Sequence, residues 1–180
     1  MSTVASLIQE ILPHAPDQGL FKAPDIPPRK LRRAIKNMAP SLKPDQVLAL
    51  FDATLLRTGG DGVLFAPTGL YYQNNNLQAP QFIPYAHVVG VREKKSLLGG
   101  RTLEVDANAG RTIVTHQIDF SAHPDMAAPV RRFLEEAMFV EEQTSEVTDR
   151  KKVQEVLQRL VAEGSLSKED FRRIMKVLDT

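Results

Sequence analysis

The chain has 180 residues, a formal net charge of +1 and a hydrophobic content of 42%. This length suits one domain of ordinary size with appendages, and the near-neutral charge does not indicate nucleic-acid binding. The absence of cysteine excludes disulfides, thiolate catalysis and cysteine-ligated metals. No apolar run approaches the ~20 residues needed to span a bilayer, and residues 1–12 lack the basic cluster of a signal peptide. We therefore expect a soluble, cytoplasmic protein.

The N-terminal part of the chain predicts two helices joined by a proline-rich connector. Apolar residues at helical spacing predict a short helix over residues 3–12, and five prolines make residues 13–28 an extended connector. Pro27-Pro28 then opens a second helix, where a missing N–H costs nothing. That helix lies in a run from Lys22 to Lys43 with seven basic residues and one acid. Its cations lie in solvent, pair with acids elsewhere in the chain, or hold phosphate or an acidic lipid headgroup. They include Arg29, Lys30, Arg32 and Arg33.

From Val47 the pattern changes to short runs of Val, Leu, Phe and Tyr, which fit a pleated, half-buried surface. Residues 47–56 predict a buried strand, with a helix as the alternative at its start, because Pro44-Asp45 resembles a helix opening. The turn signals Asp61-Gly62 and Pro67-Thr68-Gly69 separate some of the strands that follow. In the last hairpin apolar and polar residues alternate, as in a sheet with one face in water. The further strands are expected near residues 61–66, 69–73, 80–84, 87–93, 101–106 and 111–118.

A helix is expected over residues 124–140, with Phe133 and Leu134 buried on its apolar stripe. Six acids and no base then lie between Glu135 and Asp149, a composition typical of a solvated linker. Residues 151–178 predict a helical hairpin, in which Ser167 is the N-cap of the second helix. This hairpin is too short to shield its own apolar stripes, so we expect them to pack on a second copy of the chain or on the main domain. The stripes include Leu157, Leu160, Phe171 and Ile174.

Seven short strands followed by one amphipathic helix form the element order of the pleckstrin-homology (PH) architecture. The runs that begin at Gly62, Gly69, Ile83 and Val88 resemble bacterial PH-like domains over roughly residues 45–140. The resemblance implies an α+β fold, a seven-stranded PH-like antiparallel barrel or sandwich closed by a C-terminal helix, with N-terminal helices and a C-terminal helical hairpin.

The C-terminal hairpin is similar to the SHOCT motif, which implies an interaction or oligomerisation module. The residues that carry this similarity are Leu157, Leu160, Gly164, Leu166, Ser167, Glu169, Asp170, Phe171 and Leu178. The expected organisation is an N-terminal helical extension (1–44), a PH-like domain (45–142), an acidic linker (143–150) and a SHOCT-like hairpin (151–180).

The chain offers little that indicates catalysis. His116, Asp119 and His123 form its only histidine–carboxylate cluster, and a strand sends His116 and Asp119 to opposite faces. An EF-hand in the tail is excluded, because Arg159 and Val161 occupy its first two ligand positions. No glycine-rich phosphate motif is present. We therefore expect no catalytic, cofactor-binding or metal-ligating residues.

These observations predict a non-enzymatic binding and assembly protein, a scaffold whose partner is another protein or a second copy in a homo-oligomer. The alternative is a peripheral membrane adaptor that binds anionic lipid through its basic patches. Those patches are the helix cations at 29–33 and the loop that begins with Lys94 and Lys95 and carries two leucines at its tip. An enzyme is the third hypothesis, and no nucleic-acid partner is expected.

Overall fold

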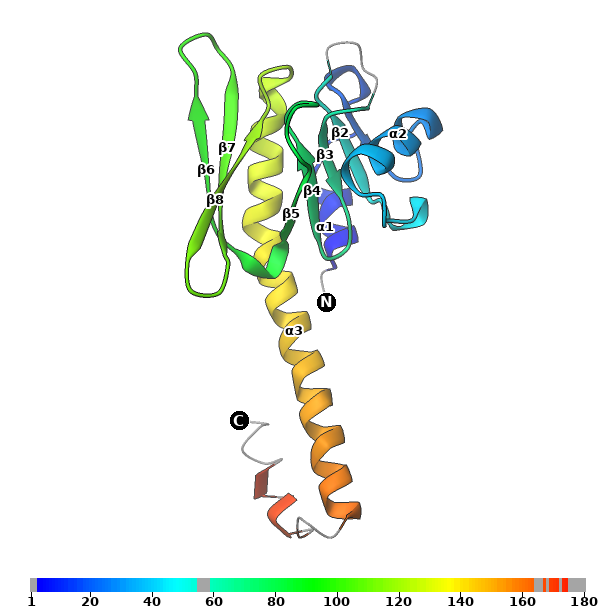
Figure 1. The fold of residues 1–180 in the computed structure, drawn as a ribbon, viewed down its shortest axis with the longest axis vertical. Coiled ribbons are helices and arrows are strands. Elements are labelled where there is room, and N and C mark those ends of the chain that lie inside the picture. Colours follow the sequence, from blue (N-terminus) through cyan, green and yellow to red (C-terminus); the bar gives the residue numbers. More distant parts are fainter. Residues whose placement is uncertain (1–2, 55–58, 164–166, 168, 172, 175–180) are drawn as a thin grey trace. The chain divides into compact units, whose positions relative to one another are not determined.

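The structure is a computed structural model that describes residues 3–54, 59–163, 167, 169–171 and 173–174, with the backbone alone for residues 141–155, 158 and 162 (Figure 1). The chain divides into two compact units, Met1–Glu141 and Glu142–Thr180. None of the described helices combines the length and the apolar character that crossing a bilayer requires.

The first unit contains a five-stranded antiparallel sheet with the strand order β1-β2-β3-β4-β5 (Figure 1). Its strands are β1 (Leu20–Lys22), β2 (Ala49–Asp52), β3 (Gly62–Phe65), β4 (Gly69–Gln73) and β5 (Gln81–Pro84). Gly62 has a φ of 137°, and a Cβ at this position would lie 1.9 Å from the Phe51 carbonyl oxygen. Only glycine therefore allows β3 to approach β2 so closely at this end.

A second antiparallel sheet of three strands follows along the chain, in the order β6-β7-β8. Its strands are β6 (Val88–Lys95), β7 (Arg101–Asn108) and β8 (Ile113–Asp119). Val105 and Ile118 on its inner face are fully buried, as the alternation predicts. The Asn74 side chain joins the two sheets, because it donates to the Gln117 carbonyl at 2.7 Å and accepts from the Asp119 N–H at 3.0 Å.

The main hydrophobic core joins the inner faces of both sheets with two helices, α1 (Val4–Ile11) and α3 (Ala127–Ala162). Phe133 and Leu134 of α3 are fully buried, which confirms the packing expected for this stripe. The Thr3 side chain caps α1 by accepting from the Ser6 N–H at 3.1 Å.

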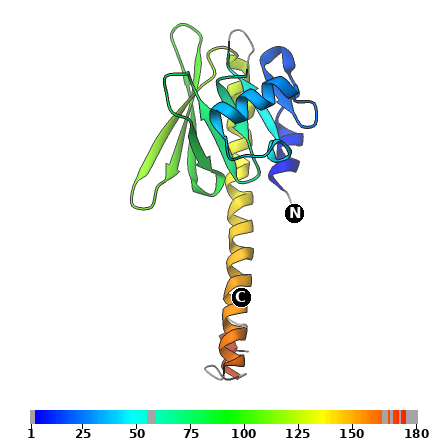
Figure 2. The ribbon, with the colours of Figure 1, turned by 45° about the vertical axis from the view of Figure 1, so that its right-hand side comes forward.

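The opposite face of the five-stranded sheet is covered by α2 (Pro28–Met38). Leu50 and Leu64 alternate along β2 and β3 with residues of the main core, and they pack with Ala34 and Met38 of α2. In the view of Figure 2, α2, in light blue, crosses in front of this sheet. The sheet is therefore buried on both faces, which explains why β2 and β3 are apolar without alternation.

The strands predicted between residues 47 and 118 are confirmed as β2 to β8. The expected α+β class, with antiparallel strands followed by a C-terminal helix, is confirmed. Of the expected barrel or sandwich, the closed barrel is wrong, because the described strands form two separate sheets, and they number eight where seven were expected. The extra strand is β1, which lies in the connector expected over residues 13–28 and pairs with β2. A proline-rich stretch and a strand share the same extended backbone, so the three residues of β1 carry no local signal of their own.

The C-terminal helix is longer than expected. The predicted helix ended near Val140, whereas α3 runs from Ala127 to Ala162 and includes the acidic residues 143–150. No proline or glycine occurs between Val130 and Glu163, and glutamate has a high helix propensity. The acidic stretch is thus helical, while the finer division of the chain into four segments stays a prediction.

Candidate functional site

Helix α2 presents a row of cations to solvent. Arg29, Arg32, Arg33 and Lys36 are exposed, whereas Ala34 on the other side of the helix is fully buried against the sheet. The helix contains no acid, and no ion pair joins these four cations to any acid in the described part of the chain.

Lys30 behaves differently from its neighbours on α2. Its Nζ lies 2.5 Å from Oδ2 of Asp52, a fully buried carboxylate at the end of β2. The other carboxylate oxygen of Asp52 accepts from the backbone N–H of Thr54 at 3.1 Å and from its hydroxyl at 2.5 Å. A buried carboxylate needs such partners, so Lys30 and Asp52 tie α2 to the strand end and neutralise each other.

A second acid lies near this pair. Asp61 is partly buried, and its Oδ1 has no hydrogen-bond partner among the described residues. Burial raises the pKa of the Asp61 carboxyl, the nearby Arg33 charge opposes this rise, and the Asp52 charge adds to it. The Asp61 carboxylate therefore interacts with the positive charge of Arg33 and offsets part of it.

The cations of α2 line a cavity of about 800 Å³. Two of its lining side chains have fixed partners, because Asn37 Nδ2 donates to the Gly60 carbonyl at 3.2 Å and Lys30 is paired with Asp52. The structure thus gathers the four predicted helix cations in one concave site. The described residues that line it are Pro27, Arg29, Lys30, Arg32, Arg33, Lys36 and Asn37.

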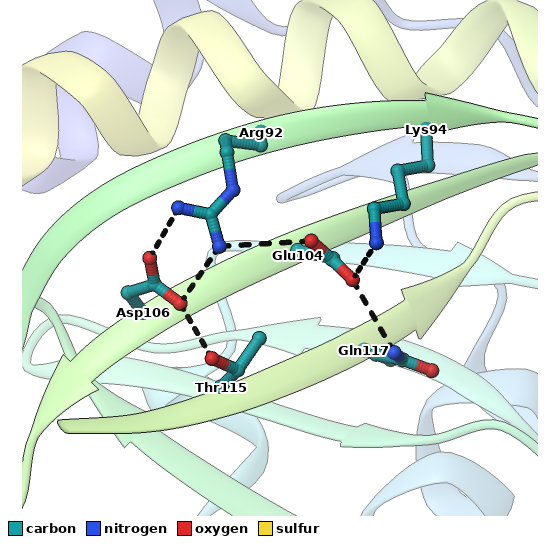
Figure 3. Close-up of polar contacts among 6 residues, drawn as sticks. All are labelled: Arg92, Lys94, Glu104, Asp106, Thr115 and Gln117. Atoms are coloured by element: carbon teal, nitrogen blue, oxygen red, sulfur yellow. Dashed lines mark hydrogen bonds and ion pairs between the residues drawn. The ribbon is translucent and has the colours of Figure 1, made fainter.

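The other predicted basic patch, at Lys94 and Lys95, belongs to the three-stranded sheet and is not part of this cavity. Figure 3 shows Lys94 directed at Glu104 on the neighbouring strand, with Nζ 2.7 Å from Oε1. Arg92 lies 2.7 Å from the Asp106 carboxylate on the same face (Figure 3). Lys94 is therefore partnered within the sheet, whereas Lys95 is exposed.

This network changes the acidity of its two carboxyls. The hydrogen bond from Lys94 is the main cause that lowers the pKa of Glu104, and the hydrogen bond from Thr115 is the main cause that lowers the pKa of Asp106. Arg92 lowers both pKa values further through its charge. On the outer face of this sheet, the cations of β6 are compensated by carboxylates of β7, of which Glu104 is itself buried.

The hairpin tip between β6 and β7 carries two fully exposed leucines. Leu97 and Leu98 are 106% and 97% exposed, and Lys95 lies close in the chain. This geometry fits the sequence expectation of a basic loop with an apolar tip.

In the second unit the predicted apolar residues remain in contact with solvent. Val156 and Ile174 are 52% and 36% exposed, and Leu157, Leu160 and Phe171 are only partly buried. No described apolar side chain of this unit is buried.

The predicted N-cap of the tail is confirmed. Ser167 Oγ accepts from the Asp170 N–H at 3.0 Å, and the Ser167 hydroxyl donates to the Asp170 carboxylate at 2.7 Å. Residues 163–165, which the sequence suggests as the turn of the predicted hairpin, lie mostly outside the described residues.

The histidine–carboxylate cluster does not form a site. His116 Nδ1 lies 3.2 Å from the Tyr72 hydroxyl, and burial lowers the pKa of His116. Asp119 is exposed and accepts from Ser121, while the His123 ring lies edge-on to Phe51. Within the described ranges, no three His, Asp or Glu side chains are placed to hold a metal ion.

The sequence did not show which acids compensate the charges of the predicted cations. Asp52 ends the apolar run of β2, and a lone acid at the end of a buried strand is a signal that a partner is required. In the sequence, Asp61 and Gly62 form a turn signal, which does not show that Asp61 lies near Arg33. Glu104 was recognised as alternating with apolar residues, but its pairing with Lys94 depends on strand register.

Comparison of the chain with protein-family models, with curated proteins and with solved structures found no significant match.

Proposed function

We propose that this chain is a non-enzymatic binding and assembly protein built from a PH-like domain and a helical tail that docks on a partner or on a second copy. The PH-like assignment is supported by the order of the elements. Strands β2 to β5 lie in one sheet, β6 to β8 lie in the next, and α3 follows. Strand β1 and helix α2 are additions to that order.

The observation that carries the assembly role is the exposed apolar surface of the tail. Val156 and Ile174 are exposed, and the other apolar side chains described in this unit are only partly buried. Burying one such side chain fully contributes about 1.5–3 kcal/mol, so an unshielded set favours association. The resemblance of the tail to the SHOCT motif points to the same role.

A peripheral membrane adaptor is the second candidate. It is favoured by the exposed cations of α2 and by the fully exposed Leu97 and Leu98 beside Lys95. Exposed leucines next to lysines are the side chains that enter the interfacial region of an anionic bilayer. Because Lys94 is paired with Glu104, the loop contributes less charge to this role than the sequence suggested.

The assembly role is tested in the full chain by light scattering on Val156→Glu/Ile174→Glu. We expect the wild-type chain to form a homo-oligomer and this variant to lose it. The matched control is Arg159→Gln/Arg173→Gln, which changes exposed polar residues of the same unit and lowers the net charge equally. The proposal is contradicted if the wild-type chain has the molar mass of a single chain and the immobilised full chain retains no protein partner.

A further inference from the structure

We propose that the cavity beside α2 is a binding site for a phosphate group, held chiefly by Arg29, Arg32 and Lys36. This inference concerns the first unit and does not depend on the assembly role of the tail. It rests on the charge left uncompensated in the cavity, on the spacing of the cations, on their chemistry and on the contacts that hold α2 in place.

The first argument is the balance of charge within the cavity. Five of the described lining residues are cationic, and two acids lie close to them. Asp52 neutralises Lys30 directly, and Asp61 offsets part of the Arg33 charge. The remaining cations have no described acid opposite them.

The second argument is the spacing of the cations along α2. Arg29 and Arg33 are four residues apart, and so are Arg32 and Lys36. Like charges at this spacing destabilise a helix. A helix with no acid and two such pairs is therefore under electrostatic strain that a bound dianion relieves.

The third argument identifies the ligand class. Arginine presents a planar fork of donors that matches phosphate oxygens, and two arginines lie here beside a lysine. The volume of about 800 Å³ is that of a small-ligand site and suits one phosphate with an attached organic group. The formal net charge of +1 does not favour a polyanion such as nucleic acid.

The fourth argument is that the site is built before the ligand arrives. The Lys30–Asp52 pair, in which the carboxylate is buried, and the Asn37–Gly60 hydrogen bond hold α2 against the end of the five-stranded sheet. A ligand then loses less binding energy to ordering of the helix. The phosphate comes either from a soluble phosphorylated molecule or from a lipid headgroup, and both present the same oxygens.

The experiment uses the full chain and two probes at low ionic strength. Inorganic pyrophosphate is titrated by calorimetry, and vesicles of phosphatidylcholine with phosphatidic acid are used in co-sedimentation. The test variant is Arg29→Gln/Arg32→Gln, which leaves the contacts of Asp52 and Asp61 in place. The matched control, Arg111→Gln/Arg159→Gln, removes the same charge from exposed residues outside this cavity.

We expect at least one probe to bind the wild-type chain and the control. The test variant should bind it at least about tenfold more weakly, because hydrogen bonds to charged groups are lost. Pyrophosphate binding indicates a soluble ligand, and binding to vesicles alone indicates a lipid headgroup. A thermal melt shows whether each variant is folded, and bound pyrophosphate should raise the wild-type midpoint. The proposal is overturned if neither probe binds, or if the control loses as much binding as the test variant.

Discussion

The packing of α3 on the sheets can be tested by truncating Phe133. This side chain is fully buried. The centroid of its ring lies 5.5 Å from the ring centroids of both Phe65 and Tyr85, with interplanar angles of 82° and 87° respectively. Phe133→Ala removes the ring from between two aromatic neighbours on different segments, so the site cannot collapse easily. We expect a loss of about 3–5 kcal/mol in the free energy of unfolding, within which the two edge-to-face contacts contribute about 0.5–1.5 kcal/mol each.

The assay is urea unfolding followed by tyrosine fluorescence. The three tyrosines lie between residues 71 and 85, so their signal reports on the first unit alone. The matched control is Phe139→Ala on the same helix, where the side chain is 57% exposed and we expect a change within about 0.5 kcal/mol. A loss below about 1 kcal/mol for Phe133→Ala, or an equal loss for both variants, would refute the packing described here.

Three further predictions follow from the charges and the backbone of the first unit. Asp52→Ala leaves Lys30 without its buried partner and should cost about 3–5 kcal/mol in urea unfolding, whereas Lys30→Met/Asp52→Leu should recover most of that loss; equal losses for both would contradict the pairing. Glu104 and Asp106 have lowered pKa values in the fold, so their stabilising contribution is present above their ordinary values of 4.5 and 3.8 and is lost as the pH falls through and below them. Glu104→Gln/Asp106→Asn should therefore flatten the acid limb of the stability curve, and an unchanged limb would speak against the network. Gly62→Ala should lower the stability by at least about 1–3 kcal/mol, because its Cβ meets a strand carbonyl at a positive φ; a neutral change would show that β3 can shift.

The elements that could be predicted from the sequence are those whose signal is local. Strands β7 and β8 alternate apolar and polar residues, and the turn between them carries asparagine and glycine, so both their existence and their facing were predictable. The burial of Phe133 followed from a helical stripe in the same way. His116 and Asp119 were correctly placed on opposite faces, because a strand alternates regardless of its partner.

The parts that escaped prediction depend on partners far along the chain. Strand β1 exists because Leu20 pairs with Phe51, and nothing within three residues shows this. The Lys30–Asp52 pair joins residues 22 positions apart, so the sequence showed a basic run but not which of its cations is neutralised. The continuous α3 was missed because composition favoured a solvated linker, while helix propensity without proline or glycine decided the backbone.

The central claim, that the tail makes this chain an assembly protein, is tested most directly by light scattering on the full chain and on a chain that ends at Glu146. The shortened chain keeps the first unit, Met1–Glu141, and lacks the exposed apolar residues Val156 and Ile174. We predict that the full chain has a molar mass that is a multiple of its one-chain mass of 20.0 kDa and that the shortened chain is a single chain. The same number of chains per particle in both would contradict the account.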